Sequence, residues 1–282
     1  MSDRTIRRLH AAYRDDIGDL GTRRPLPGPQ IAQLDPFLFL NHHGPQTYPP
    51  SNRGLPFGPH PHRGFETVTF ILEGSLMHKD SAGHASVIGA GGVQWMTAGR
   101  GIIHAEISPP EFLEHGGALE ILQLWVNLPA RLKMTAPAYV GLQGGEIPAH
   151  PAAGATVRLI AGEWEGHRGP VHPLLDMFMA VVEFEPAGSA WFHGLEGRSV
   201  FLYVVRGTVS IAGQLAPQYN LVELEDGDTL HLSAVDRALV LVGHAAPLGE
   251  PVVAHGPFVM NTREEIVQAI DDYQAGKFGP PM

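Results

Sequence analysis

The most constraining feature of this sequence is a series of short runs rich in β-branched and aromatic residues, punctuated by Gly, Pro or Asp-Gly pairs. Runs of about six to ten residues have the usual length of strands. With 34 Gly and 25 Pro in 282 residues, the chain has many turns without reaching a low-complexity composition. The pattern predicts an all-β sandwich or barrel. The runs are "ETVTFIL" (66–72), "GVQWMTA" (92–98), "LEILQLWVNL" (119–128), "TVRLIAG" (156–162), "MFMAVVEFE" (177–185), "SVFLYVVRGTVSIAG" (199–213), "DTLHLS" (228–233) and "RALVLVGH" (237–244).

One stretch near the C-terminus, "NTREEIVQAIDDYQAGKFG", has helical periodicity instead. Thr262 and Glu265 have the spacing of a capping box, and Ile266, Ile270 and Tyr273 follow at i, i+4 and i+7. A glycine three residues after the tyrosine is placed to end the helix. We therefore expect a short C-terminal helix that covers a flank of the β body.

The two halves of the chain resemble each other weakly. "TFILEGSLM" (69–77) and "YVVRGTVSI" (203–211) both read as strand, charged residue, Gly and strand, which favours duplication of one β-barrel unit. Between the halves lies a stretch rich in Pro, Gly and Ala with little periodicity. We expect an N-terminal domain over residues 1–135, a linker over 136–155 and a C-terminal domain over 156–282.

Composition limits the partners and the chemistry. The formal net charge is −10 and no basic cluster interrupts it, which disfavours direct binding of nucleic acid. The chain has no cysteine, so a bound metal must use nitrogen and oxygen ligands. The N-terminus lacks a signal-peptide core, and no window approaches the roughly 20 apolar residues of a membrane span. We expect a cytoplasmic protein that does not bind membranes.

Two pairs of metal-ligating side chains stand out, "HPH" with His60 and His62, and "HAE" with His104 and Glu106. In extended backbone, residues two apart point to the same face, with Cα atoms roughly 6.5–7 Å apart. If the two segments lie on neighbouring strands of one barrel, three imidazoles and one carboxylate converge on one point. The spacing predicts a metal site.

The predicted donor set narrows the chemistry. Imidazole nitrogen and carboxylate oxygen suit one divalent ion of Fe, Mn, Ni, Cu or Zn. Four protein ligands on a six-coordinate ion leave two positions open for water, O₂ or a chelating substrate. One carboxylate leaves a net charge of about +1, which would attract an ionised enol or phenol oxygen.

The other histidines of the chain are not expected to be metal ligands. The chain has 16, so an HxH pair by itself is weak evidence, and the second pair at the same spacing is what strengthens it. His42 and His43 are adjacent and point to opposite faces of a strand, so we expect a solvated loop and no chelation there. His193 and His244 have no partner pair, which predicts surface or loop positions and a metal-free second half.

Four segments carry a resemblance to a known family. They are "HPHRGFETVTFILEGSLMHKDSAGH", "QWMTAGRGIIHAE", "LQLWVNLPARLKM" and "EPVVAHGPFVMNTREEIVQAIDDYQAGKFG". Together they resemble the pirin family of the cupin superfamily. The resemblance implies a bicupin, with two stacked antiparallel β-barrel (jelly-roll) domains and one metal ion, most readily Fe(II), in the N-terminal barrel. By position, the ligands would be His60, His62, His104 and Glu106.

Two further residues lie close to the first pair in the sequence, Arg63 and Glu66. The general cupin pattern has a glutamate shortly after its HxH, and Glu66 stands there. In pirins the carboxylate ligand comes from the second motif, so Glu66 is expected to support the ligands or the fold. Arg63 is expected either to bond a ligand carboxylate or Glu66, or to cap a turn.

The resemblance implies two different functions. Some bacterial pirins resemble flavonol 2,4-dioxygenases, the quercetin 2,3-dioxygenase type, in which a chelated, deprotonated flavonol reacts with O₂ and releases carbon monoxide. Glu106 and Glu66 are then the candidates to accept the hydroxyl proton. Other pirins are iron-dependent, redox-sensitive regulators that bind a transcription factor or a metabolic enzyme. Both functions use the same four ligands, so both stay open here, and we expect a monomer.

Overall fold

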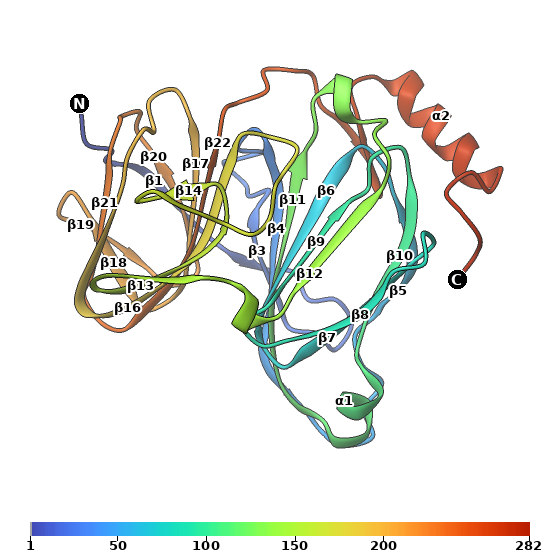
Figure 1. Ribbon diagram of the computed structural model, residues 1–282, viewed down its shortest axis with the longest axis horizontal. Helices are drawn as coiled ribbons and strands as arrows, with labels where there is room; N and C mark the ends of the chain where they lie inside the picture. Colours follow the sequence, from blue (N-terminus) through green and yellow to red (C-terminus); the bar gives the residue numbers. More distant parts are fainter. Residues whose placement is uncertain (1) are drawn as a thin grey trace. The chain divides into compact units, whose positions relative to one another are not determined.

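The computed structural model describes residues 2–282, which are built mainly of antiparallel strands (Figure 1). Within this range there are two α-helices, α1 (Pro110–His115) and α2 (Arg263–Gln274), and two short 3₁₀ helices, η1 (Ala130–Leu132) and η2 (Gly144–Glu146). This confirms the predicted all-β fold with a C-terminal helix. Of the helices in the described part, none is long and apolar enough to cross a membrane.

The chain forms two compact units, and each unit is assembled from separate segments. The first barrel comprises Arg14–Arg23, Leu38–Gly145 and Leu248–Met282; the second barrel comprises the N-terminal segment through Tyr13, Arg24–Phe37 and Glu146–Pro247. The sequence analysis divided the chain into continuous segments instead. The difference arises because the N-terminal strand pairs within the second barrel and the C-terminal helix packs within the first.

Two sheets make up the first barrel. Their shared features are antiparallel pairing and buried apolar side chains, including Ile71, Leu76 and Ile121. One sheet has the order β5 (Phe57–His62), β10 (Ile102–Ile107), β7 (Ser75–Asp80) and β8 (Ala85–Gly89). The other has the order β12 (Ala138–Leu142), β9 (Val93–Thr97), β6 (Phe65–Glu73), β11 (Gly117–Asn127), β4 (Phe37–Tyr48), β3 (Thr22–Leu26) and β2 (Tyr13–Arg14).

The second barrel is one large sheet around an apolar core that includes Phe178, Leu202 and Val240. Its order is β1 (Ile6–Ala11), β20 (Asn220–Leu224), β17 (Ser199–Arg206), β22 (Ala238–Ala245), β16 (Met177–Phe192), β21 (Leu230–Ala234), β18 (Thr208–Ile211) and β19 (Gln214–Pro217), with β13 (Ala149–Ala161) also paired to β16. Two small hairpins complete the chain, β14 (Glu163–Trp164) with β15 (His167–Arg168), and β23 (Val253–His255) with β24 (Phe258–Met260). The expected linker is thus largely ordered, since it contains β12 and the start of β13.

The C-terminal helix α2 begins as its sequence predicts. The side chain of Thr262 accepts from the backbone N–H of Glu265, and the Glu265 carboxylate accepts from the backbone N–H of Thr262, so the capping box is complete. Ile266 and Ala269 are buried in a cluster with Phe258 of β24 and Phe278. Tyr273, the last residue of the apolar stripe of α2, is 38% exposed, so α2 packs against the first barrel mainly through its first two turns.

His42 and His43 are not in a solvated loop, and that expectation was wrong. Both lie on β4 and are fully buried. As the strand period requires, they point different ways: His42 Nε2 is 2.8 Å from Glu120 Oε1, and His43 Nδ1 is 2.8 Å from Thr22 Oγ1. Hydrogen bonds to buried polar partners make their burial tolerable.

Candidate metal centre

The two predicted ligand pairs lie on neighbouring strands. β5 carries His60 and His62, β10 carries His104 and Glu106, and the two strands pair antiparallel with His104 directly opposite His60. The sequence analysis required the two segments to lie on neighbouring strands for their four side chains to share one region of a barrel. β5 and β10 meet this requirement. The register shifts between His104 and Glu106, so the second pair does not repeat the geometry of the first.

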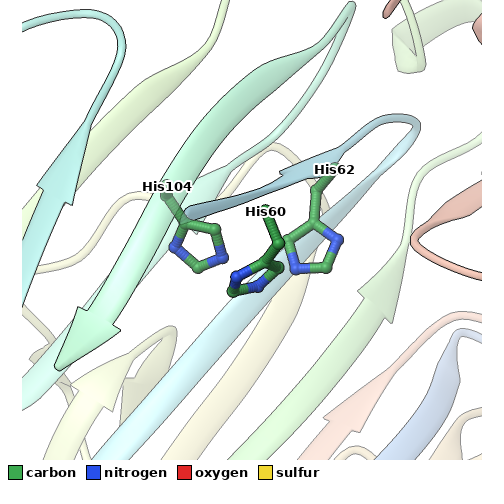
Figure 2. A group of neighbouring side chains, drawn as sticks. All are labelled: His60, His62 and His104. Carbon is green, nitrogen blue, oxygen red and sulfur yellow. The ribbon is translucent and has the colours of Figure 1, made fainter. Parts of the chain in front are cut away.

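The three histidines form one compact group. One ring nitrogen from each of His60, His62 and His104 lies within 4.8 Å of the others. The ring centroids are 4.4 Å apart for His60 and His104, 4.8 Å for His60 and His62, and 4.9 Å for His62 and His104. Figure 2 shows the three rings gathered around one small volume. Three imidazoles at this separation can act together as nitrogen ligands.

Backbone carbonyls fix the orientation of two of these rings. His60 Nδ1 lies 2.7 Å from the carbonyl oxygen of Gly58, and His62 Nδ1 lies 3.1 Å from that of Pro257. A carbonyl can only accept, so the proton sits on Nδ1 in both rings, and Nε2 keeps its lone pair. This is how proteins prepare a histidine for metal binding.

The electrostatic environment keeps the three rings neutral. Burial lowers the pKa of His60, and burial together with the neighbouring His60 lowers the pKa of His62 to about 3. Burial, with His62 and His60 adding to it, holds the pKa of His104 well below its usual value. A neutral imidazole is the form that binds a metal, so little proton competition remains at pH 7.

His104 supplies the test of whether the site fits a metal ion. Both of its ring nitrogens are buried and neither has a hydrogen-bond partner. A buried polar group without a partner costs about 1–3 kcal/mol, so such groups are rare in native folds. A metal ion held by the trio would satisfy one of these nitrogens, which makes the residues a good fit for a divalent ion of the nitrogen-binding kind.

Glu106 does not belong to the compact group, and its carboxylate has other partners. Its Oε1 accepts from Thr69 Oγ1 at 2.6 Å, and its Oε2 accepts from Gln123 Nε2. Burial raises the Glu106 pKa to about 7, against the lowering effect of these two donors. The role of Glu106 as a fourth ligand stays a prediction, but its position on β10 and its shifted pKa place a proton acceptor in the same barrel.

Glu66 lies on the face of β6 that is turned away from Glu106 and the histidines. Thr69 reaches Glu106, and residues three apart on a strand point to opposite faces, so Glu66 of β6 faces away from the site. Its Oε1 accepts from Thr97 Oγ1 at 2.6 Å, its Oε2 is buried without a partner, and burial raises its pKa to about 7. The structure brings the three histidines together and does not bring Glu66 to them.

Arg63 holds the C-terminal helix. Its Nη1 donates to Asp272 Oδ2 at 2.8 Å, its Nε donates to the carbonyl of Arg100, and its guanidinium lies 4.7 Å from the ring centre of Phe278. Its carboxylate partner is therefore Asp272 on α2 and not a predicted ligand or Glu66, and its bond to the Arg100 carbonyl agrees with the expected turn cap. Arg63 directly follows His62, so its bond to Asp272 ties α2 to the end of β5 that carries a predicted ligand.

Several residues around the site were not identified from the sequence. Trp125 and Phe65 pack against His62, with ring centroids 5.3 and 4.9 Å from it, and the Trp125 indole N–H is buried without a partner. His78, bonded to Asp80 at 2.9 Å, lies 5.6 Å from His104. Only strand alternation could have indicated them, because no motif marks these positions.

Comparison with known families gives two matches. A family model described as Pirin matches residues 19–126, and one described as the Pirin C-terminal cupin domain matches residues 179–279. Together they cover most of both halves of the chain.

Individual relatives agree with the family matches. A pirin-like protein from Caulobacter vibrioides is 43% identical over 259 residues, which are 90% of this chain and 91% of the relative. A crystal structure described as quercetin 2,3-dioxygenase from Acinetobacter baumannii is 34% identical, with a TM-score of 0.93 and 100% of both chains covered. The bacterial pirin YhhW from Escherichia coli, solved with nickel(II), is 22% identical with a TM-score of 0.68 over 85% of this chain and 99% of that one, which shows a shared fold.

Proposed function

The chain belongs to the pirin family, and we propose that it is a metal-dependent dioxygenase that cleaves flavonols of the quercetin type with O₂. The observation that carries this proposal is the trio of neutral histidines in the first barrel, of which His60 is half-buried and His62 and His104 are buried, with both nitrogens of His104 unbonded. The likeness over its whole length to a structure described as a quercetin 2,3-dioxygenase supports the substrate class.

We assign the metal to His60, His62 and His104, with Glu106 as a fourth ligand when it is ionised. A divalent ion bound there, with Fe(II) the first choice and Ni, Mn, Cu or Zn as alternatives, would supply Lewis-acid and redox chemistry toward a chelated hydroxyl and O₂. The carbonyls of Gly58 and Pro257 hold two of the rings in the ligating tautomer.

Glu106 is the base in this proposal. Burial raises the Glu106 pKa to about 7 in the metal-free protein, and a bound cation would favour the ionised carboxylate, which is the form that can take up the acidic proton of a flavonol hydroxyl. Thr69 and Gln123 hold its two oxygens, so the carboxylate has a fixed orientation. Trp125 and Phe65 form a flat apolar wall beside His62 that suits an aromatic substrate.

The test begins with elemental analysis of the purified protein, which should give about one metal ion per chain. Protein loaded with Fe, Ni, Mn or Cu is then mixed with quercetin without O₂, and O₂ is added while its consumption and carbon monoxide release are measured. Glu106→Gln keeps a carbonyl oxygen but cannot take up a proton. Its turnover per metal-loaded site should fall by about 10²–10⁴.

Two outcomes would change the assignment. If no metal form of the wild type turns over any flavonol, the oxygenase proposal fails, and the iron-dependent regulator that binds a protein partner becomes the better account. If Glu106→Gln keeps most of the turnover per metal, Glu106 is a ligand or a structural group, and the substrate deprotonates without it.

A further inference from the structure

The Glu106 carboxylate is held from across the interior of the first barrel. Glu106 lies on β10 of the four-stranded sheet, and its two hydrogen-bond donors, Thr69 of β6 and Gln123 of β11, lie on the other sheet. Thr69 and Gln123 stand directly opposite each other in the β6–β11 ladder, so their side chains share one face of that sheet. Two neutral donors from the facing sheet therefore fix the position of this carboxylate.

The face that carries these two donors also packs against the histidine trio. The ring of Phe65, an even number of residues before Thr69 on β6, lies 4.9 Å from that of His62. The ring of Trp125, the second residue after Gln123 on β11, lies 5.3 Å from that of His62. Residues an even number of positions apart on a strand point to the same face. Thr69 and Gln123 therefore point into the region that contains His62.

Glu106 lies on the same side of β10 as His104. The pairing of β10 with β7 is regular at this point, with His104 opposite Asp80 and Glu106 opposite His78, so the two β10 side chains follow the strand period. The ring of His78, which neighbours Glu106 across the ladder, lies 5.6 Å from that of His104. The Glu106 side chain thus stands beside the trio, while its oxygens are bonded to Thr69 and Gln123 on the facing sheet.

The two donors differ in how easily they can move. Thr69 bonds Oε1 of Glu106 at 2.6 Å; it is 1% exposed and β-branched, so few rotamers are open to it. Gln123 bonds Oε2; it is only half-buried, and its longer side chain rotates about more bonds. Oε1 can therefore stay on Thr69 while Oε2 leaves the Gln123 amide.

We propose that Gln123 competes with the metal ion for Oε2 of Glu106. In the metal-free protein Oε2 accepts from the Gln123 amide, and in the metal-bound protein Oε2 is the fourth ligand while Thr69 keeps Oε1 in place. Gln123 therefore lowers the metal affinity, and it gives Oε2 a partner whenever the carboxylate is off the ion and can act as a base. This inference rests on the metal assignment of the proposed function and not on the substrate.

Isothermal titration with Ni(II) at pH 8, above the Glu106 pKa of about 7 in the metal-free protein, measures the competition. Gln123→Met keeps the length of the side chain and removes the donor, so Ni(II) should bind about threefold to tenfold more tightly. Thr69→Val keeps the shape and removes a bond that orients the ligand, so binding should be about threefold to tenfold weaker. A general loosening of the barrel would weaken binding in both variants. Gln214→Met, at an exposed position on β19, should leave the affinity unchanged.

A double-variant cycle shows whether the effect of Gln123 passes through Glu106. In a Glu106→Ala background, Gln123→Met should no longer change the Ni(II) affinity. The inference is overturned if Gln123→Met binds Ni(II) no more tightly than the wild type, or if its gain persists without Glu106. If the wild type binds no Ni(II), the metal assignment fails and this inference fails with it. If the affinities change as expected but no flavonol is turned over, only the dioxygenase proposal fails.

Discussion

His62 Nδ1 lies 3.1 Å from the carbonyl oxygen of Pro257, a residue 195 positions later in the chain. The C-terminal segment thus orients a ring that we assign to the metal. Arg63, the next residue, bonds Asp272 of α2, and the backbone N–H of Val259 donates to the carbonyl of Arg63. α2 and the β23–β24 hairpin are therefore connected to the predicted metal ligands, although neither contributes a residue to the histidine trio.

The first prediction tests this connection. Asp272→Asn removes the negative charge that holds both Arg63 and the Lys277 side chain, which bonds Asp272 at 2.7 Å. We expect metal affinity to fall about tenfold, as for other groups that orient ligands. Isothermal titration with Ni(II) measures it. Glu264→Gln, an exposed change on the same helix, should leave the affinity unchanged; equal affinities for Asp272→Asn and the wild type would show that α2 does not position His62.

The second prediction concerns the stability of the metal-free protein. His104→Leu removes two buried nitrogens that have no partner, so the metal-free variant should be more stable than the wild type by about 1–3 kcal/mol. Urea unfolding after chelator treatment measures the free energy, and elemental analysis should show that the variant no longer retains metal.

His62→Leu is the matched control for that change. It should also lose the metal, but it breaks the bond to Pro257 and should destabilise the metal-free protein. If His104→Leu were the less stable variant, the nitrogens of His104 would have partners in solution that the structure does not contain.

The third prediction concerns a buried amine. Lys133 Nζ donates to the carbonyls of Gly64 and Val259 at 2.8 and 3.0 Å and to Asn127 Oδ1 at 2.6 Å, and burial lowers its pKa to about 8. Lys133→Met leaves three acceptors without a donor. We expect a loss of about 3 kcal/mol in the free energy of unfolding, measured by urea titration. Lys79→Met, at an exposed position on β7, should change stability by less than about 0.5 kcal/mol, and a similar small change for Lys133→Met would contradict the role of its hydrogen bonds.

Much of the fold and part of the site could be predicted from local sequence. Strand runs and turn residues indicate the all-β architecture, and the capping box of Thr262 and Glu265 marks the start of α2. The HxH spacing places His60 and His62 on one face of a strand, and the distance to His104 is short because β5 and β10 pair.

What the sequence could not supply were contacts between distant segments. No local pattern shows that Pro257 would orient His62, or that Glu120 and Thr22 would be the buried partners of His42 and His43. Strand alternation places Glu66 and Thr69 on opposite faces of β6, but only the three-dimensional fold shows which of the two faces is turned toward the histidines.

The last prediction is that Glu66 affects the pH dependence of stability but not metal binding or turnover. Its folded pKa is about 7 and its ordinary value is 4.5, so between these two pH values the folded protein holds the proton more tightly than the unfolded chain. Stability associated with this group is therefore present at low pH and is lost as the pH rises from 4.5 to 7, by up to about 3 kcal/mol. Glu66→Gln stays neutral, so it should be more stable than the wild type at pH 8 and nearly equal to it at pH 4.5, as measured by urea unfolding of the metal-free proteins. Glu106 is present in both proteins, so its own shifted pKa largely cancels in the comparison.

Because Glu66 faces away from the histidines, the variant should also keep the wild-type metal affinity and flavonol turnover. A variant that gains no stability at pH 8 but loses metal or turnover would place Glu66 in the site, contrary to its position on β6.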